Sequence, residues 1–202
     1  MASSSCTTAR LLALVLAAGA FTVTTHASAD TLIIRSPGDH SRYLFEAEPH
    51  LLLGLIDAPR AASGTGFGVG FRGTFTLVNN GFVQTINNSI GLGVGLDWVH
   101  YSRGRNRCVI DAGPSKVVNC DDSESVANLW IPVVMQWNFF LSRQWSVFGE
   151  PGVAIHYQSV AEPQHFFLEP QMYVGGRWHF SDAMTLTMRL GYPTFSVGVS
   201  FM

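Results

Sequence analysis

The feature that most constrains this chain is an alternation of apolar and polar residues with a period of two, which recurs from residue 43 to the C-terminus. In residues 64–77 the odd positions hold large apolar side chains such as Phe67 and Val69, while the even positions hold Gly, Thr or Arg. Successive side chains of a β-strand point to opposite faces of the sheet. The stretch therefore predicts a strand with one apolar face and one face of small or polar residues.

Eight stretches of this kind follow one another: residues 43–55, 64–77, 88–101, 126–139, 145–157, 167–180, 185–190 and 195–201. We expect strands of about 9–14 residues, which match the roughly 9–11 tilted residues that cross a bilayer better than the roughly 5–6 residues usual in soluble sheets. An even number of strands returns both chain ends to one side of the membrane. The longest connection, residues 102–125, then emerges on the other side.

A soluble β-sandwich would show the same alternation, and composition separates the two folds. A sandwich exposes its polar face to water and tends to carry many Lys and Glu there, whereas this chain contains a single lysine, Lys116, and only 13% charged residues. Soluble domains have roughly 25%. Small and polar residues on the second face are typical of a narrow barrel interior. The sequence predicts an all-β fold: an eight-stranded antiparallel transmembrane up-and-down β-barrel over residues 43–202, monomeric by default.

The first 29 residues predict a secretory signal peptide that precedes this barrel. Arg10 is their only charge, an apolar run covers residues 11–23, and Ala27-Ser28-Ala29 supplies a small-residue cleavage site after Ala29. The apolar run is too short to cross a bilayer, and no later stretch offers 18 consecutive apolar residues, which excludes a helical membrane protein. Residues 30–42 are predicted to be periplasmic, as an inner cap, as a tether or without a role.

Four prolines are the weakest points of the strand assignment: Pro49, Pro132, Pro151 and Pro170. Proline cannot donate to the hydrogen-bond ladder of a sheet. We expect these residues at bulges or near strand ends.

Ionisable side chains recur on the polar face and are expected to project into the lumen: Glu46, Glu48, His50, Arg72, Asp97, Glu150, His156, Glu169, Arg177, His179 and Arg189. An isolated buried charge is too costly, so these charges must be paired. A loop symmetric about residue 60 would place Glu48 opposite Arg72. The set predicts a salt-bridged plug; the alternative is a narrow polar pore, or a pocket along the glycines at 66, 68, 70, 91, 93 and 95.

Other chemistries have weaker support. Gly68–Gly73 matches the dinucleotide-binding pattern G-x-G-x-x-G, but the strand simply continues after it, where that pattern needs a helix. His156 with Ser159 and Glu162 is the nearest candidate for a hydrolase, and His50, His156 and His179 lack the tight spacing of metal ligands. With 12 Lys+Arg against 14 Asp+Glu, the chain has no basic surplus for nucleic acid. We predict no enzyme activity, no cofactor and no metal.

Cys108 and Cys120 lie in the long connection, residues 102–125. In an oxidising compartment this pair predicts a disulfide. The connection is basic at its start and acidic at its end, and it is either a solvated hairpin or a recognition surface for lipopolysaccharide or an external partner.

The signal peptide, the eight alternating stretches and the last strand, Phe195 to Met202, together resemble the small outer-membrane β-barrels of Gram-negative bacteria, which include OmpA-, OmpX- and OmpW-like barrels. The resemblance implies a place in the outer membrane, contact with its lipids, and assembly by the barrel-assembly machinery, which reads a C-terminal aromatic residue. Here that residue is Phe201, and Met202 follows it. The resemblance names no substrate. A structural or surface-interaction role, passage of small solutes and, more remotely, lipid modification therefore remain alternatives.

Overall fold

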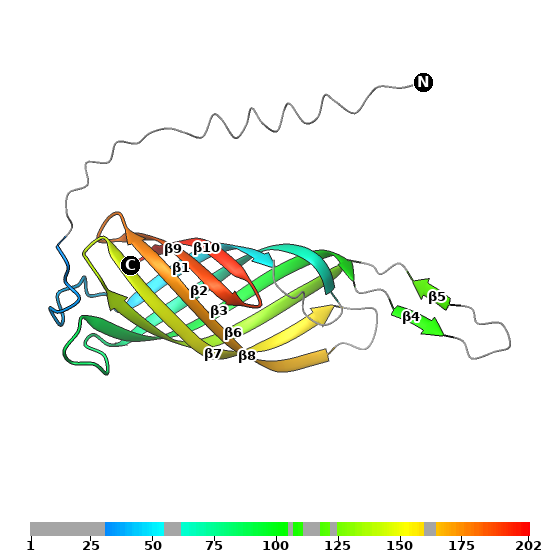
Figure 1. The fold of residues 1–202 in the computed structure, drawn as a ribbon, viewed down its shortest axis with the longest axis horizontal. Coiled ribbons are helices and arrows are strands. Elements are labelled where there is room, and N and C mark those ends of the chain that lie inside the picture. Colours follow the sequence, from blue (N-terminus) through cyan, green and yellow to red (C-terminus); the bar gives the residue numbers. More distant parts are fainter. Residues whose placement is uncertain (1–30, 55–61, 105–106, 111–117, 122–124, 160–164) are drawn as a thin grey trace, which may run out of the picture. The chain divides into compact units, whose positions relative to one another are not determined.

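A closed barrel of eight antiparallel strands is the main body of the protein (Figure 1). The structure, a computed structural model, describes residues 31–54, 62–104, 107–110, 118–121, 125–159 and 165–202. The predicted signal peptide therefore lies outside the described residues. The barrel strands are β1 (Phe45–Gly54), β2 (Ala62–Val78), β3 (Asn88–Gly104), β6 (Val126–Phe140), β7 (Trp145–Ser159), β8 (His165–His179), β9 (Met184–Tyr192) and β10 (Phe195–Phe201).

Each barrel strand pairs with the next one along the chain, and β1 pairs with β10 to close the sheet. The up-and-down topology and all eight predicted strands are confirmed. We call the end that carries the turns at residues 79–87, 141–144 and 180–183 the inner end of the barrel. Within the described part of the chain, no helix is long and apolar enough to cross a membrane.

The two-residue period separates the wall of the barrel into two chemically different faces. Along β6, buried and more accessible residues alternate from Val126 to Phe140. On the outside, apolar side chains are exposed, and Leu168 reaches 72% exposure. On the inside, polar and charged side chains are buried, and Arg72 is only 2% exposed. The two-residue period thus separates an accessible apolar face from a buried polar face.

Three of the four prolines, Pro49, Pro132 and Pro151, do not lie where the sequence predicted. Pro132 pairs with Ala154 of β7 in the middle of β6, and the β6–β3 pairing skips it but keeps one register on either side. Pro49 and Pro151 are likewise interior to β1 and β7, again without a register shift. Each strand has two neighbours, so a missing N–H interrupts the ladder on one side only. The ladder on the other side keeps the strand in place.

The connection between β3 and β6 contains a small hairpin of its own, formed by β4 (Arg107–Ile110) and β5 (Val118–Asp121). Its register places Cys108 directly opposite Cys120, and Arg107 opposite Asp121. The two cysteines are therefore direct cross-strand neighbours.

Candidate functional site: the ion-paired lumen

Glycines on the inward face create the space in which the lumen side chains lie. A Cβ atom added at Gly66 would lie 2.7 Å from the ring of Tyr101, and one at Gly70 would lie 2.6 Å from Asp97 Oδ1. At Gly95 it would lie 3.2 Å from Arg72 Nε. The glycines thus make room for large side chains of neighbouring strands. These side chains occupy the space in which the sequence analysis placed an alternative pocket.

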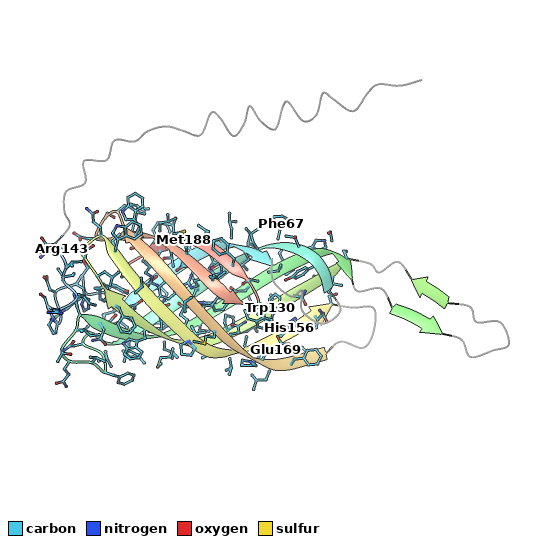
Figure 2. All side chains as sticks on the ribbon, in the orientation of Figure 1. Phe67, Trp130, Arg143, His156, Glu169 and Met188 are labelled. Atoms are coloured by element: carbon cyan, nitrogen blue, oxygen red, sulfur yellow. The ribbon has the colours of Figure 1, made fainter. Side chains whose placement is uncertain are left out.

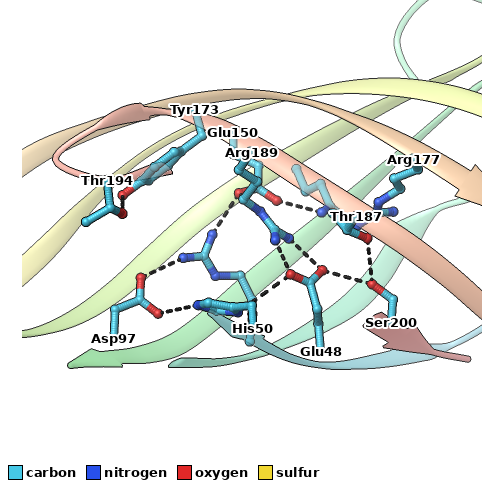
Figure 3. Close-up of polar contacts among 12 residues, drawn as sticks. Glu48, His50, Asp97, Glu150, Tyr173, Arg177, Thr187, Arg189, Thr194 and Ser200 are labelled. Atoms are coloured by element: carbon cyan, nitrogen blue, oxygen red, sulfur yellow. Dashed lines mark hydrogen bonds and ion pairs between the residues drawn. The ribbon is translucent and has the colours of Figure 1, made fainter. Parts of the chain in front are cut away.

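Arg189 joins two carboxylates that come from strands far apart in the sequence. Its Nη2 donates to Glu48 Oε2 at 2.9 Å, and its Nε donates to Glu150 Oε2 at 2.9 Å. Nη1 makes a further contact with Glu48, so both terminal nitrogens of Arg189 bind that carboxylate. β9 thereby contacts β1 and β7 across the lumen (Figure 3).

The same network continues from Glu150 to the opposite wall. Arg72 donates to Glu150 Oε2 at 2.7 Å and to Asp97 Oδ2 at 3.2 Å. Asp97 Oδ1 lies 2.9 Å from His50 Nε2, and His50 Nδ1 lies 3.6 Å from Glu48 Oε1. Six side chains from five strands therefore form a closed ring, which we call the charge ring: Glu48, Arg189, Glu150, Arg72, Asp97 and His50.

The charge ring is nearly balanced. It contains three carboxylates against two guanidinium groups, and it is neutral when His50 carries a proton. Further polar groups add hydrogen bonds to it: Ser200 donates to Glu48 at 2.8 Å, and Gln136 donates to Glu150 at 2.6 Å. Such hydrogen bonds lower the cost of burying the carboxylates, while Arg72 Nε and His50 Nδ1 have no hydrogen-bond partner among the described residues.

A second ion pair lies between the charge ring and the inner end. Arg177 donates to Glu46 Oε1 at 2.8 Å and to Asn138 Oδ1 at 3.3 Å. Its guanidinium lies 4.8 Å from the centre of the Phe148 ring, and the guanidinium of Arg189 lies 5.2 Å from the same ring. Phe148 thus contacts the cations of both clusters, which links them through cation–π contacts.

A third polar group lies toward the end of the barrel opposite Arg143 (Figure 2). His156 lies 3.1 Å from Glu169 and 2.8 Å from Asn128 Oδ1, and it stacks on Trp130 with ring centroids 4.5 Å apart. His179, the last predicted member, is at the inner end, where its ring nitrogens contact Ser146 and Thr185 at 2.9 Å.

The register between β1 and β2 agrees with the sequence analysis, whereas the ion pairs do not follow it. Glu48 is the cross-strand neighbour of Arg72, as predicted. However, the cation that Glu48 binds is Arg189, and Arg72 binds Asp97 and Glu150. Side chains of adjacent strands point the same way, and a long arginine reaches across the lumen to carboxylates on other strands. Register alone therefore does not identify the partner.

Sequence reasoning missed an apolar cluster inside the barrel: Leu52, Val99, Tyr101, Val126, Trp130 and Ala154. All six occupy inward positions of the same two-residue period that identified the charges. The alternation therefore indicated that these six side chains point inward. Only the ionisable residues of that face were considered from the sequence. Packed apolar side chains therefore lie in the lumen beside the ion pairs.

The structure does not bring together the two described members of the alternative hydrolase site, His156 and Ser159. His156 is buried in the lumen, whereas Ser159 is exposed. Glu162 lies outside the described residues. Among the described residues, no group of three or more His, Cys, Asp or Glu side chains is arranged to hold a metal ion.

Comparison with known proteins gives structural neighbours but no family. No protein-family model matches the sequence, and no curated protein matches it. A de novo designed transmembrane β-barrel is 10% identical with a TM-score of 0.44, over 83% of this chain and 98% of that one. Ail, the attachment invasion locus protein of Yersinia pestis, solved in complex with the heparin analogue sucrose octasulfate, is 8% identical with a TM-score of 0.43, over 78% and 94%. Ail in a phospholipid bilayer nanodisc gives 8% and 0.42, over 77% and 97%.

These similarities are distant, with every TM-score below 0.5. The fold assignment rests instead on the strand pairing of the protein itself, which closes the sheet without an edge.

Proposed function

We propose that this protein is a small bacterial outer-membrane β-barrel with a plugged lumen and a structural or surface-interaction role. The observation that carries the proposal is the combination of an exposed apolar outer wall with an ion-paired, buried interior on one closed sheet. A water-soluble barrel would have the opposite arrangement of polar and apolar faces.

The outer wall supports the membrane part of the proposal. Exposed apolar side chains recur on every barrel strand except β10, where only Phe201 is strongly exposed. Burying apolar area in lipid gains about 25 cal/mol per Å² relative to water, and soluble monomers rarely expose continuous patches of this kind. Exposed aromatic residues lie near the strand ends, with Trp145 and Trp178 toward the inner end and Trp98 toward the outer end. Aromatic rings at both ends fit the two interfaces of a bilayer.

The charge ring supports a plugged lumen. An eight-stranded barrel encloses a space just wide enough for its own side chains. Here the ring crosses that space between β1, β2, β3, β7 and β9, and the apolar cluster fills the part beyond it. Passage of small solutes is the weaker candidate, because an ion would have to replace several buried ion pairs along its way.

The β4–β5 hairpin supports the surface role. Residues directly opposite each other in antiparallel strands have Cα atoms about 4.5–5.5 Å apart. That separation lies within the roughly 4.4–6.8 Å spanned by disulfides, and Cys108 and Cys120 are such a pair. We propose that a disulfide rigidifies the 102–125 connection, which would present a fixed surface to lipopolysaccharide or an external partner.

Biogenesis follows from the same proposal. Removal of residues 1–29 after Ala29 would release the barrel to the periplasm, and the assembly machinery would read Phe201. This residue pairs with Ala47 on β1 and Met184 on β9, at the inner end of the closing strand.

The test is to refold residues 30–202 into lipid vesicles and to record currents across planar bilayers. We expect insertion, with a heat-modifiable mobility on gels, and bilayers that stay electrically silent. Discrete, salt-dependent openings would overturn the plugged lumen and support the passage of solutes. Failure to insert would overturn the membrane location.

A further inference from the structure

The segment that precedes β1, residues 31–44, is held against the inner end of the barrel by backbone hydrogen bonds. Ile33 N donates to Leu141 O at 2.9 Å, Asn87 N donates to Ile34 O at 2.7 Å, and Thr76 N donates to Leu44 O at 3.0 Å. The Ile33 side chain is 4% exposed. Of the three interpretations of this segment, these contacts support the inner cap.

Asn87, in the β2–β3 turn, is the central contact of the docked segment. It is completely buried, and its Nδ2 donates to Asp39 O at 3.0 Å. Its Oδ1 lies 2.6 Å from His40 Nδ1, and its backbone oxygen accepts from Phe140 N at 3.0 Å. One asparagine therefore ties the segment to both the turn and the end of β6.

His40 is held in a single orientation by this arrangement. Its ring lies parallel to that of Phe140, with centroids 4.1 Å apart and planes 3° from parallel. Because Asn87 Nδ2 donates to Asp39, Oδ1 is the acceptor, and neutral His40 must carry its proton on Nδ1. Nε2 is then an acceptor atom that is buried and has no hydrogen-bond partner among the described residues.

Behind the segment lies a cavity of about 580 Å³ at the inner mouth of the barrel, lined by groups that include His40, Tyr43, Phe140, Arg143 and His179. Tyr43 connects this region to the lumen, because its hydroxyl accepts from Arg177 Nη1 at 3.4 Å. Burial raises the pKa of Tyr43 to about 12, so it stays protonated when the surrounding pH changes over the physiological range.

We propose that residues 31–44 form a lid on the inner mouth, latched by Asn87 and released when His40 takes up a second proton. That proton would place a charged N–H where no acceptor is offered by the described residues, against the Phe140 ring. Detachment would open the cavity and remove Tyr43 from Arg177. The docking contacts do not depend on the proposed membrane location.

The charged and titratable groups around the latch come from four parts of the chain. Asp39 and Arg42 flank His40 on the lid, and Arg143, in the β6–β7 turn, lies 3.3 Å from Asp39 Oδ1. His179 and Asp182 also line the cavity. Burial lowers the pKa of His40 below its ordinary 6.5, and Arg42 lowers it further; the hydrogen bond to Asn87 and the charge of Asp39 only partly compensate.

The direction of the pH effect follows from that lowered pKa. The detached lid binds a proton at His40 more readily than the docked lid does. Docking is therefore strongest above pH 6.5 and weakens as the pH falls below 6.5 toward the lower pKa of the docked state. One site changes the docking constant by at most about tenfold per pH unit.

The experiment is hydrogen–deuterium exchange of residues 30–202 in detergent micelles at about pH 7.5 and about pH 5, expressed as protection relative to intrinsic rates. We expect amides of residues 31–44 to be protected at the higher pH and to lose protection severalfold, at most about thirtyfold, at the lower pH. Amides of the barrel strands should not change, except that of Thr76, which donates to Leu44 O of the lid. The exchange experiment uses micelles and does not need insertion into a bilayer. A barrel that fails to insert into vesicles can therefore be distinguished from a lid that does not respond to pH.

Three variants make the result specific. His40→Gln keeps a side chain that can donate to Asn87 but cannot titrate, and should abolish the pH response. His100→Gln, at an exposed histidine on the outer wall, should leave the response unchanged. Asn87→Ala should expose the lid at both pH values. A pH-independent wild-type lid, a response that persists in H40Q, or a protected lid in N87A would each overturn the proposal.

Discussion

Arg189 shows at the residue scale how the lumen tolerates its charges. Its guanidinium contacts Glu48 on β1 and Glu150 on β7, and all three side chains are buried. Burial alone would favour neutral forms, whereas the pairing of opposite charges within hydrogen-bond distance compensates for lost hydration. The cost of removing one partner is therefore much larger than the net contribution of the pair.

Arg189→Met is expected to lower the free energy of unfolding by about 3–5 kcal/mol, because two buried carboxylates would lose their shared cation. Denaturant titration of the barrel in lipid vesicles measures this change. Arg143→Met is the matched control: it removes an exposed ion pair with Asp39 and should cost less than about 1 kcal/mol. Equal effects of the two substitutions would contradict the charge ring as a buried network.

Gly66 tests the packing of the lumen in the same way. In Gly66→Ala the new methyl group would lie 2.7 Å from both Tyr101 and Val99, so it should destabilise the barrel by about 1–3 kcal/mol. Gly176→Ala should be nearly neutral, because nothing lies within 4 Å of the added atom. If both variants unfold at the same denaturant concentration, Tyr101 does not fill the glycine row.

At the element scale, the strands carry the barrel and the connections carry its specific features. The barrel strands hold each other in register, so proline can replace a donor within β1, β6 and β7 without a shift. The β2–β3 turn supplies Asn87, which fixes the lid, and the β4–β5 hairpin pairs Cys108 with Cys120. The barrel strands thus form the scaffold. The connections between them hold the lid at the inner end and contain the β4–β5 hairpin.

The β4–β5 hairpin gives an element-scale prediction. Intact protein should show no reactive thiol at Cys108 or Cys120 under denaturing conditions without reductant, and both should react after reduction. Reduction should raise the protease sensitivity of the 102–125 connection and leave the heat-modifiable mobility of the barrel unchanged, because the hairpin forms a separate two-stranded sheet. Two free thiols in protein secreted to an oxidising compartment would contradict the disulfide.

At the scale of the whole molecule, the barrel places its polar groups inside and its apolar groups outside. This arrangement fits an apolar solvent, because lipid would remove the exposed apolar side chains of the outer wall from water. The closed sheet also gives every barrel strand a hydrogen-bonded neighbour on each side, which fits the need of a bilayer for internally paired backbone groups.

Val133 lies on the outer wall in the middle of β6 and provides a test of that arrangement. Val133→Arg should lower the stability of the barrel in a bilayer by about 2–4 kcal/mol, as expected for a charge near the midplane. Val133→Leu should change it little. Folding titrations in vesicles give both values, and a neutral effect of arginine would indicate that this wall faces water.

The strands and their inward and outward faces could be read from the sequence, because alternation is a local property of consecutive residues. The same alternation placed Glu48 opposite Arg72 once the β1–β2 loop was taken as symmetric. The partners of these charges could not be read, because Arg189 reaches Glu48 only after β1 and β10 close the sheet. Nor did any sequence pattern single out Asn87, a turn residue whose contacts with Asp39 and His40 are long-range.

The sequence by itself therefore determined the number and order of the barrel strands and which side chains face the lumen, whereas the strand lengths, from 7 to 17 residues, depart from the expected range of about 9–14. Only the tertiary structure decided which of these side chains form the charge ring, which fill the apolar cluster, and how residues 31–44 dock on the inner mouth. The physical reason is that side-chain direction depends on the local backbone, whereas ion pairing and lid docking depend on the closure that brings distant strands and turns together.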